Sequence, residues 1–136
     1  MAARFFVDEN DLAFGELLAT RHHDVVLPGH PALPEVLRGS PDDVWLPVIG
    51  AQQLVVITRD QRIRYRAAKK LMWVRHGVRG FVLTGRKSQS TADSLSVLER
   101  HWARIEAAVA GRTAGPWMYA VTDSGLREIL LGEPSL

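Results

Sequence analysis

The sequence has 136 residues, a formal net charge of +2, 46% hydrophobic and 24% charged residues, which is typical of one globular domain spanning 1–136. It contains no cysteine, which excludes disulfides and thiolate metal sites and agrees with a reducing compartment. No apolar run approaches the roughly 20 residues that span a bilayer, and the N-terminus is too short and too quickly charged for a signal peptide. We therefore expect a cytoplasmic protein that does not contact a membrane.

The charge is distributed unevenly along the chain. Residues 1–58 carry −5, residues 59–87 carry +9 and residues 88–136 carry −2. A basic block beside an acidic half attracts polyanions such as nucleic acid, although a solvated helix face is the more common explanation of such a block. Both interpretations stay open at this point.

The N-terminal half alternates short apolar runs with helical patterns. The elements expected here are strands over 4–7, 24–27 and 54–58, helices over about 11–21 and 40–52, and a loop over 28–39 in which 34–38 could form one turn. In the second helix, Ser40 is expected as the N-cap and Pro41 at the first helical position. The run 54–58 is apolar and mostly β-branched, which predicts a central strand covered on both faces.

The C-terminal half continues the alternation and ends in two strands. The elements expected here are a basic helix over 62–72, a strand over 80–84, a helix over about 91–110 capped by Ser90, and a β-hairpin of 117–121 with 127–131. Trp102 falls on the apolar stripe of the long helix and is interpreted as a core residue. The whole pattern predicts an α/β fold, a mostly parallel central sheet flanked by helices, with a C-terminal β-hairpin.

Acidic residues fall where expected elements begin or end. Asp8 ends the first strand, Asp42 and Asp43 open the helix before the third strand, and Asp60 ends the third strand. Carboxylates at the same end of neighbouring parallel strands lie roughly 5–10 Å apart, and this edge is where α/β sheets collect ligands. Such a cluster suits Mg²⁺ or Mn²⁺, which activates water and neutralises a phosphodiester. The alternative is that each acid caps its own neighbouring helix.

These motifs together resemble the PIN-like ribonucleases, in particular toxins of the VapC type. In that family the first strand ends in Asp, often with Asn two residues on, which is matched by Asp8 and Asn10. A middle helix supplies a second acid, and a strand-terminal Thr-x-Asp supplies a third, matched by Thr58 and Asp60. The resemblance covers about residues 4–84. Each motif is short, so its specificity comes from the order of the motifs.

The resemblance implies Mg²⁺- or Mn²⁺-dependent cleavage of RNA by a metal-bound water. It assigns Asp8 and Asp60 to the metal together with one of Asp42 and Asp43, of which Asp43 is preferred. Asn10 and Thr58 would support these acids by hydrogen bonds. The phosphate-binding candidates are Arg59, Arg62, Arg64 and Lys69. The partners implied are RNA and an antitoxin protein, and a homodimer is left open.

One departure from the family and two rival functions bear on this hypothesis. No acid follows Asp60 before Asp93, which favours a three-acid site with one metal over a two-metal site. The main rival is a non-catalytic PIN-like module that binds RNA or protein. A phospho-acceptor receiver domain is the weaker rival, because no lysine follows the fourth apolar run in the required setting.

Overall fold

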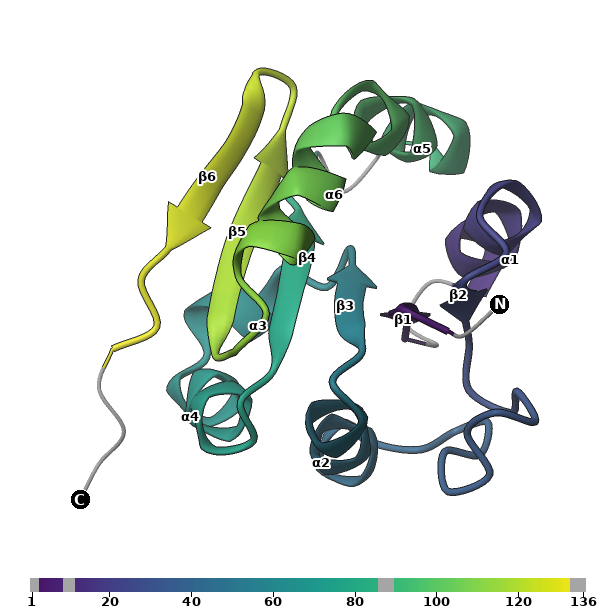
Figure 1. Ribbon diagram of the computed structural model, residues 1–136, viewed down its shortest axis with the longest axis vertical. Coiled ribbons are helices and arrows are strands. Elements are labelled where there is room, and N and C mark those ends of the chain that lie inside the picture. The colour runs from purple at the N-terminus through teal and green to yellow at the C-terminus, as the bar shows by residue number, and fades with distance from the viewer. Residues whose placement is uncertain (1–2, 9–11, 86–89, 133–136) are drawn as a thin grey trace.

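The computed structural model describes residues 3–8, 12–85 and 90–132. Its centre is one six-stranded sheet with the order β2-β1-β3-β4-β5-β6 (Figure 1). The strands are β1 (Phe5–Val7), β2 (Val25–Val26), β3 (Val55–Thr58), β4 (Arg79–Leu83), β5 (Trp117–Thr122) and β6 (Gly125–Ile129). All neighbours pair in parallel except β5 with β6, which form an antiparallel hairpin. The mostly parallel α/β sheet and its terminal hairpin are therefore confirmed.

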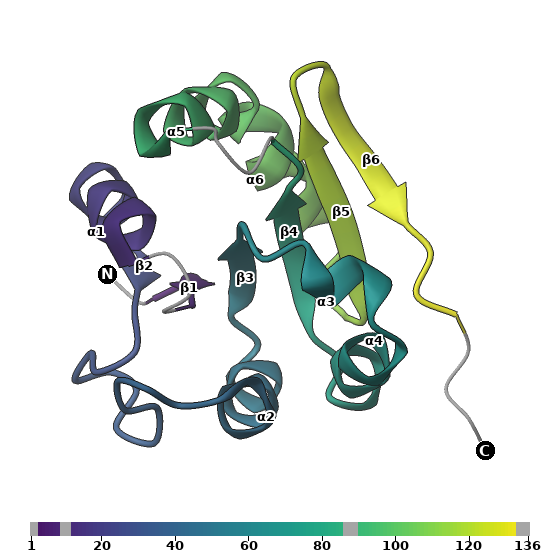
Figure 2. The same cartoon turned by 180° about the vertical axis from the view of Figure 1, so that it is seen from behind.

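Helices cover both faces of the sheet, as Figures 1 and 2 show from opposite sides. The helices are α1 (Leu12–Arg21), α2 (Asp42–Gln52), α3 (Arg62–Tyr65), α4 (Ala67–Arg75), α5 (Thr91–Arg100) and α6 (Trp102–Gly111). Side chains of α1, α5 and α6 pack with one face of the sheet, and side chains of α2, α3 and α4 pack with the other. The fold therefore has three layers, which is why β1, β3 and β4 are apolar on both faces.

Side-chain alternation along the strands decides which residues meet which helices. Phe5 and Val7 of β1 belong to the cluster that packs under α1, α5 and α6, whereas Phe6 belongs to the cluster under α2, α3 and α4. The same alternation places Ile57 on the first face and Val56 on the second. The side-chain period of a strand is two residues. Asp8, two residues after Phe6, and Thr58, two residues after Val56, are therefore expected on the face covered by α2, α3 and α4.

Two helices that the sequence predicts as continuous are broken in the structure. The basic helix is divided into α3 and α4 at Arg66, whose backbone is extended at φ −91° and ψ 119°. The long amphipathic helix is divided into α5 and α6 at His101, with φ −107° and ψ 12°. The buried His101 ring lies 3.0 Å from the Asp123 carbonyl oxygen through Nε2. This contact ties the break to the turn of the hairpin.

The helix starts differ in their capping. Ser90 caps α5 as predicted, since its side chain accepts the backbone N–H of Asp93. The expected Ser40 cap of α2 is wrong, because Pro41 occupies the N-cap position without a side-chain hydrogen bond and the helix begins at Asp42. The Ser40 hydroxyl instead donates to the Leu37 carbonyl at 2.7 Å, so the preceding loop uses it.

Trp102 is only half-buried, although it packs against the core as expected. Its ring lies 5.1 Å from Phe5 and stacks on His22 at 3.9 Å. The described helices include none with the length and apolar character needed to cross a bilayer.

Candidate active site

Asp8 and Thr58 meet where β1 and β3 end. Val7 pairs with Ile57 in the parallel register, so the next residues of the two strands lie side by side. The Thr58 hydroxyl donates to Asp8 Oδ1 at 3.0 Å. Both side chains are buried, with 4% exposure for Asp8. The strand register therefore brings together two residues that are 50 positions apart.

Asp60 is joined to this pair through the same threonine. The Asp60 backbone N–H donates to Thr58 Oγ1 at 3.0 Å, so the hydroxyl links the backbone of one acid to the carboxylate of the other. Asp60 also caps the following turn, because its Oδ1 accepts the Arg62 backbone N–H at 3.1 Å. The N-cap of α3 is Gln61, which has no side-chain cap hydrogen bond, so Asp60 closes the turn before the helix and does not occupy the N-cap itself. This turn bond does not exclude a second role for the carboxylate.

The Asp60 carboxylate carries an ion pair. Arg62 Nε donates to Asp60 Oδ1 at 2.9 Å and Arg62 Nη2 donates to Oδ2 at 3.1 Å. Only 5% of the Asp60 side chain is exposed, against 55% of the Arg62 side chain. A buried carboxylate is therefore neutralised by an arginine that lies largely in solvent.

The two acids at the start of α2 have different surroundings. Asp42 Oδ1 accepts the Trp45 indole N–H at 3.1 Å, and Lys69 of α4 donates to Asp42 Oδ2. Asp43 is exposed. The charge of Asp42 raises the pKa of Asp8, which places Asp42 close to the end of β1.

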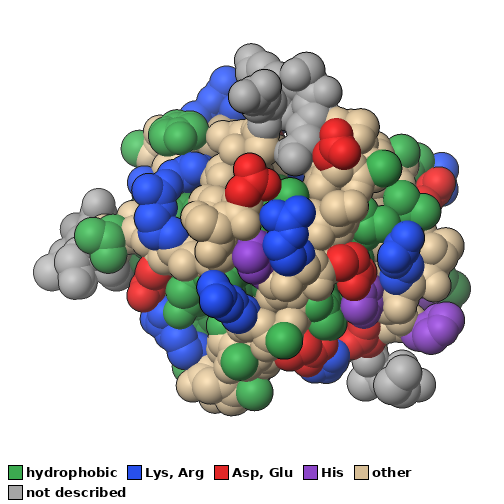
Figure 3. Space-filling model, turned by 90° about the horizontal axis from the view of Figure 1, so that it is seen from above, with side chains coloured by type: hydrophobic (Ala, Val, Ile, Leu, Met, Phe, Trp, Pro, Cys, Tyr) green, Lys and Arg blue, Asp and Glu red, His purple; other side chains and the backbone are tan. Residues whose placement is uncertain are grey.

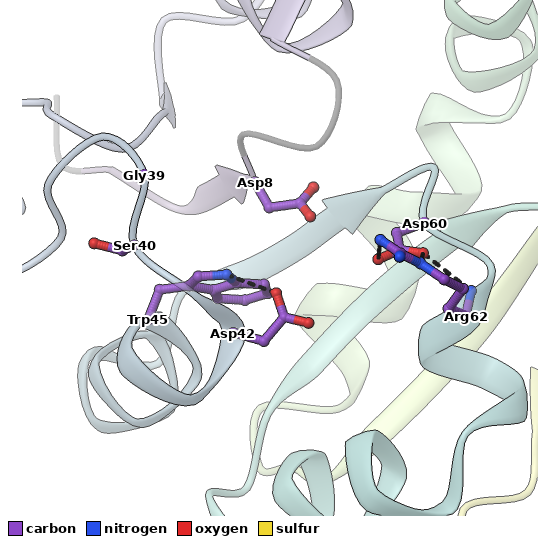
Figure 4. A pocket seen from close by; sticks show the side chains of 7 residues that line it. All are labelled: Asp8, Gly39, Ser40, Asp42, Trp45, Asp60 and Arg62. Atoms are coloured by element: carbon purple, nitrogen blue, oxygen red, sulfur yellow. Dashed lines mark hydrogen bonds and ion pairs between the residues drawn. The ribbon is translucent and has the colours of Figure 1, made fainter.

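These side chains surround one pocket of about 250 Å³. It is lined by Asp8, Gly39, Ser40, Asp42, Trp45, Asp60 and Arg62. Figure 4 shows the Asp8 carboxylate pointing from the end of β1 toward Asp60, with Asp42 below on α2. Three acids from distant parts of the sequence therefore open into one small space, and the preferred Asp43 is not among the lining residues.

Burial changes the acidity of Asp8. Loss of hydration raises the pKa of Asp8 to about 7, because the charged form is poorly solvated there. The hydrogen bond from Thr58 acts in the opposite direction, and the charges of Asp42 and Asp60 raise the pKa further. Within the described residues no cation pairs with Asp8. It is therefore the acid in the pocket that is held near its point of ionisation.

Asp60 behaves in the opposite way. Burial acts to raise the pKa of Asp60, but hydrogen bonds from Arg62 and the charges of Arg62 and Lys69 outweigh it and hold that pKa below its ordinary value. The hydrogen bonds and charge of Asp60 raise the pKa of Arg62, and the charges of Asp42 and Asp8 add to this. The guanidinium therefore interacts electrostatically with all three carboxylates.

Comparison with known proteins now places the chain. A family model described as a PIN-like domain matches residues 3–85, which contain all three acids of the pocket and end just after β4. The chain belongs to the PIN-like domain family. Comparisons with curated proteins and with solved structures gave no match. PIN-like domains are commonly nucleases, and α5, α6 and the hairpin lie beyond the matched part.

The four phosphate-binding candidates of the PIN-like domain lie in different places. Arg62 and Lys69 contact the pocket acids, as described above. Arg59 lies over the Phe14 ring of α1 at 5.8 Å, on the sheet face away from the pocket. Arg64 is half-buried and lies over the Tyr65 ring at 5.0 Å. Of these four candidates, Arg62 lines the pocket and Lys69 contacts one of its acids from outside the lining.

Sequence reasoning missed the residues that complete the pocket wall. Trp45 was expected only as part of the α2 pattern, and Gly39 and Ser40 only as loop and cap, yet all three line the pocket. The one sequence signal for this contact is the spacing of Asp42 and Trp45, which lets the indole N–H donate to a carboxylate three residues earlier in the helix. Asn10, expected to support the acids, lies outside the described residues.

Lys and Arg side chains do not form a uniform surface on the face of the molecule that Figure 3 shows. Figure 3 looks onto the molecule from the side at which β3, β4 and β5 end, and Lys and Arg side chains are spread over this face among acidic ones. A polyanion that approaches this edge therefore meets positive charge at separate points rather than in one continuous patch.

Proposed function

We propose that this PIN-like domain is a metal-dependent endoribonuclease and that the pocket of Asp8, Asp42 and Asp60 is its active site. The observation that carries the proposal is the convergence of three carboxylates, from β1, α2 and the end of β3, on one pocket of about 250 Å³. The family match supports a nuclease-type function in general terms. RNA as the substrate follows from the resemblance to PIN-like ribonucleases and from the cations beside the acids.

The donor groups suit a hard divalent cation. Mg²⁺ and Mn²⁺ bind carboxylate oxygens and water, and the pocket offers carboxylates from three elements. As the side chains lie, however, the described residues contain no group of three acids or histidines placed to hold a metal. Arg62 and Lys69 occupy two of the three carboxylates. Metal binding at Asp8, Asp42 and Asp60 therefore requires rearrangement of side chains in this pocket.

A divalent ion held there would lower the pKa of bound water and neutralise charge on the phosphodiester. The protein's own residues would do the rest. Ionised Asp8, oriented by the Thr58 hydroxyl, would add negative charge to the pocket. Arg62 and Lys69 would supply positive charge beside it, where an RNA phosphate needs compensation. Trp45 would orient Asp42 through its indole N–H.

Cleavage of labelled RNA tests the proposal. The full chain is incubated with single-stranded RNA in Mg²⁺ or Mn²⁺, with excess chelator, and as the D8N variant. We expect cleavage only by the unmodified chain with metal. The amide introduced in D8N keeps an oxygen that accepts the Thr58 hydroxyl, so circular dichroism should show a folded variant. Cleavage that persists in chelator or in folded D8N would contradict the proposal.

The ion pairs favour one alternative function. Since Arg62 and Lys69 already neutralise Asp60 and Asp42, the acids have a structural explanation, and the chain would then be a non-catalytic PIN-like module that binds RNA or protein. Binding of RNA that is insensitive to chelator, without cleavage, is the result that supports this alternative.

We further propose that the protein is the toxin of a type II toxin–antitoxin pair and that an antitoxin covers the pocket. The support is the resemblance in motif order to the short VapC-type toxins. Induced expression in a bacterial host tests this: the unmodified chain should arrest growth and D8N should not. Equal growth of both strains at equal protein levels would reject the toxin role.

A further inference from the structure

Arg62 is the cation that neutralises Asp60 within the candidate site. Its guanidinium donates two hydrogen bonds to the Asp60 carboxylate, and it lines the same pocket as Asp8 and Asp42. Asp60 is nearly fully buried and needs a cation to remain ionised. The cation that serves it is a long side chain that is 55% exposed. An exposed side chain on a flexible stem can leave more easily than the carboxylate that it neutralises.

Lys69 is the less exchangeable cation of the two. Its side chain is 22% exposed, against 55% for Arg62, and it is not among the residues that line the pocket. Lys69 approaches Asp42 from α4, whereas Arg62 lies beside Asp60 in the lining of the pocket (Figure 4). If one ion pair opens for a ligand, the geometry favours the pair of Arg62 with Asp60.

Formal charge also favours replacement of Arg62 by a divalent ion at Asp60 over binding of the ion beside Arg62. With Asp8 ionised, the three carboxylates are balanced by Lys69 and one divalent ion, which leaves the charge of Arg62 in excess. An RNA phosphate carries one negative charge, and a guanidinium binds phosphate oxygens with two parallel hydrogen bonds. The pocket is therefore neutral with Lys69, a divalent ion, Arg62 and one phosphate together.

We infer that Arg62 is an exchangeable counter-ion, which neutralises Asp60 when no metal is bound and moves to an RNA phosphate when a divalent ion takes its place. The inference rests on the proposed function, since it concerns the same pocket and ligand. It makes metal binding and RNA binding cooperative: metal releases the phosphate-binding group, and the phosphate holds that group away from Asp60. Arg62 is thus a positioning and binding residue rather than a constant structural partner.

The test is a pair of binding measurements in which R62Q should change Mn²⁺ affinity and RNA affinity in opposite directions. Mn²⁺ affinity is measured by calorimetry at pH 8 on the full chain, and affinity for a labelled single-stranded RNA by fluorescence anisotropy, with either Mn²⁺ or chelator present. R62Q should bind Mn²⁺ about tenfold more tightly, because it lacks the guanidinium that competes with Mn²⁺ for the Asp60 carboxylate. In Mn²⁺ it should bind RNA about tenfold more weakly. In chelator its RNA affinity should stay within about threefold of the unmodified chain. Because the unmodified chain is expected to cut RNA in Mn²⁺, anisotropy is read only within the time over which parallel gels show the labelled RNA to be uncut.

R66Q is the matched control. Arg66 is exposed and lies between α3 and α4, so the variant removes the same charge one helical turn away without touching Asp60. It should change Mn²⁺ affinity by less than about threefold. R62K keeps the charge and should lie between R62Q and the unmodified chain, which provides a second series should R62Q fold poorly.

The outcomes separate this inference from the proposed function. If the chain binds Mn²⁺ and cleaves RNA but R62Q binds Mn²⁺ no more tightly than R66Q does, the exchange is refuted and the nuclease proposal stands. If R62Q binds RNA more weakly than the unmodified chain does, and by the same factor in chelator and in Mn²⁺, then Arg62 contacts RNA whether or not metal is bound. That result also refutes the exchange of Arg62 between Asp60 and phosphate. If neither the unmodified chain nor R62Q binds Mn²⁺, both proposals fail.

Discussion

Asp8→Asn should change how the stability of the protein depends on pH. Burial raises the pKa of Asp8 to about 7 from 3.8, so between these values the native state holds a proton that the unfolded state has lost. Stability from this group is fully present below about pH 4 and is lost as the pH rises through 7. About three pKa units correspond to about 4 kcal/mol. D8N has no such ionisation, so it should be more stable than the unmodified chain above pH 7.

Urea unfolding of both proteins between pH 4.5 and 8.5, in chelator, measures this directly. The free energy of unfolding of the unmodified chain, relative to D8N, should fall across this range by about 3 kcal/mol, because part of the total effect is already lost at pH 4.5. Adding Mn²⁺ at pH 8 should then stabilise the unmodified chain and not D8N, because a ligand of the native state adds to its stability. Parallel pH profiles for the two proteins would refute the assignment of a buried carboxyl group with a raised pKa at this position.

Two further predictions concern the scaffold. Ser90→Ala should lower the free energy of unfolding by about 1 kcal/mol, because Ser90 caps α5. Ser96 lies on the exposed side of α5, so Ser96→Ala should not lower it. Equal effects of the two substitutions in urea unfolding would argue against the cap. Gly80→Ala should cost about 1–3 kcal/mol, since a Cβ would lie 2.6 Å from the Val56 carbonyl oxygen. At Gly111 an added Cβ would have no atom within 4 Å apart from its chain neighbours and the backbone of its own helix, so Gly111→Ala should be neutral or stabilising. A G80A protein as stable as G111A in the same assay would mean that β3 and β4 separate without cost.

The sheet was predictable because its strands are short, apolar and punctuated by acids. Asp8 and Asp60 each follow such a run, and parallel pairing of neighbouring strands then requires that both lie at one edge of the sheet. The alternation of side chains also carries information that the sequence reasoning did not use. Asp8 and Thr58 share the parity of Phe6 and Val56, so they face α2, whereas Arg59 has the other parity and lies over Phe14.

The choice between Asp42 and Asp43 depended on one residue of register. The preference for Asp43 assigned Asp42, the acid nearer Pro41, to the start of the helix. In the structure Pro41 is the N-cap and Ser40 bonds to the preceding loop, and Asp42 lines the pocket whereas Asp43 does not. The hydrogen bond of Ser40 to Leu37 lies in the loop before the helix, so no pattern within the helix indicates that Ser40 is not the cap.

The ion pairs were also beyond the sequence. Arg62 and Lys69 were expected to hold phosphate, but neither the break at Arg66 nor the approach of α4 to α2 was predicted. That break separates α3 from α4 and accompanies the contact of Lys69 with Asp42. A continuous helix over 62–72 would present these two cations differently. Charge composition therefore indicated which residue types gather near the acids, and only the tertiary structure showed which carboxylate each one neutralises.

The most direct measurement is the rate of RNA cleavage by D42N and D43N, side by side with the unmodified chain in Mg²⁺. The two variants remove the same charge from adjacent residues of one helix, and only Asp42 lines the pocket. We predict that D42N loses cleavage by at least about 100-fold, in line with the loss of a group that acts directly in the site, and that D43N cleaves as the unmodified chain does. Loss of cleavage in D43N with retention in D42N would contradict the account and move the site off this pocket.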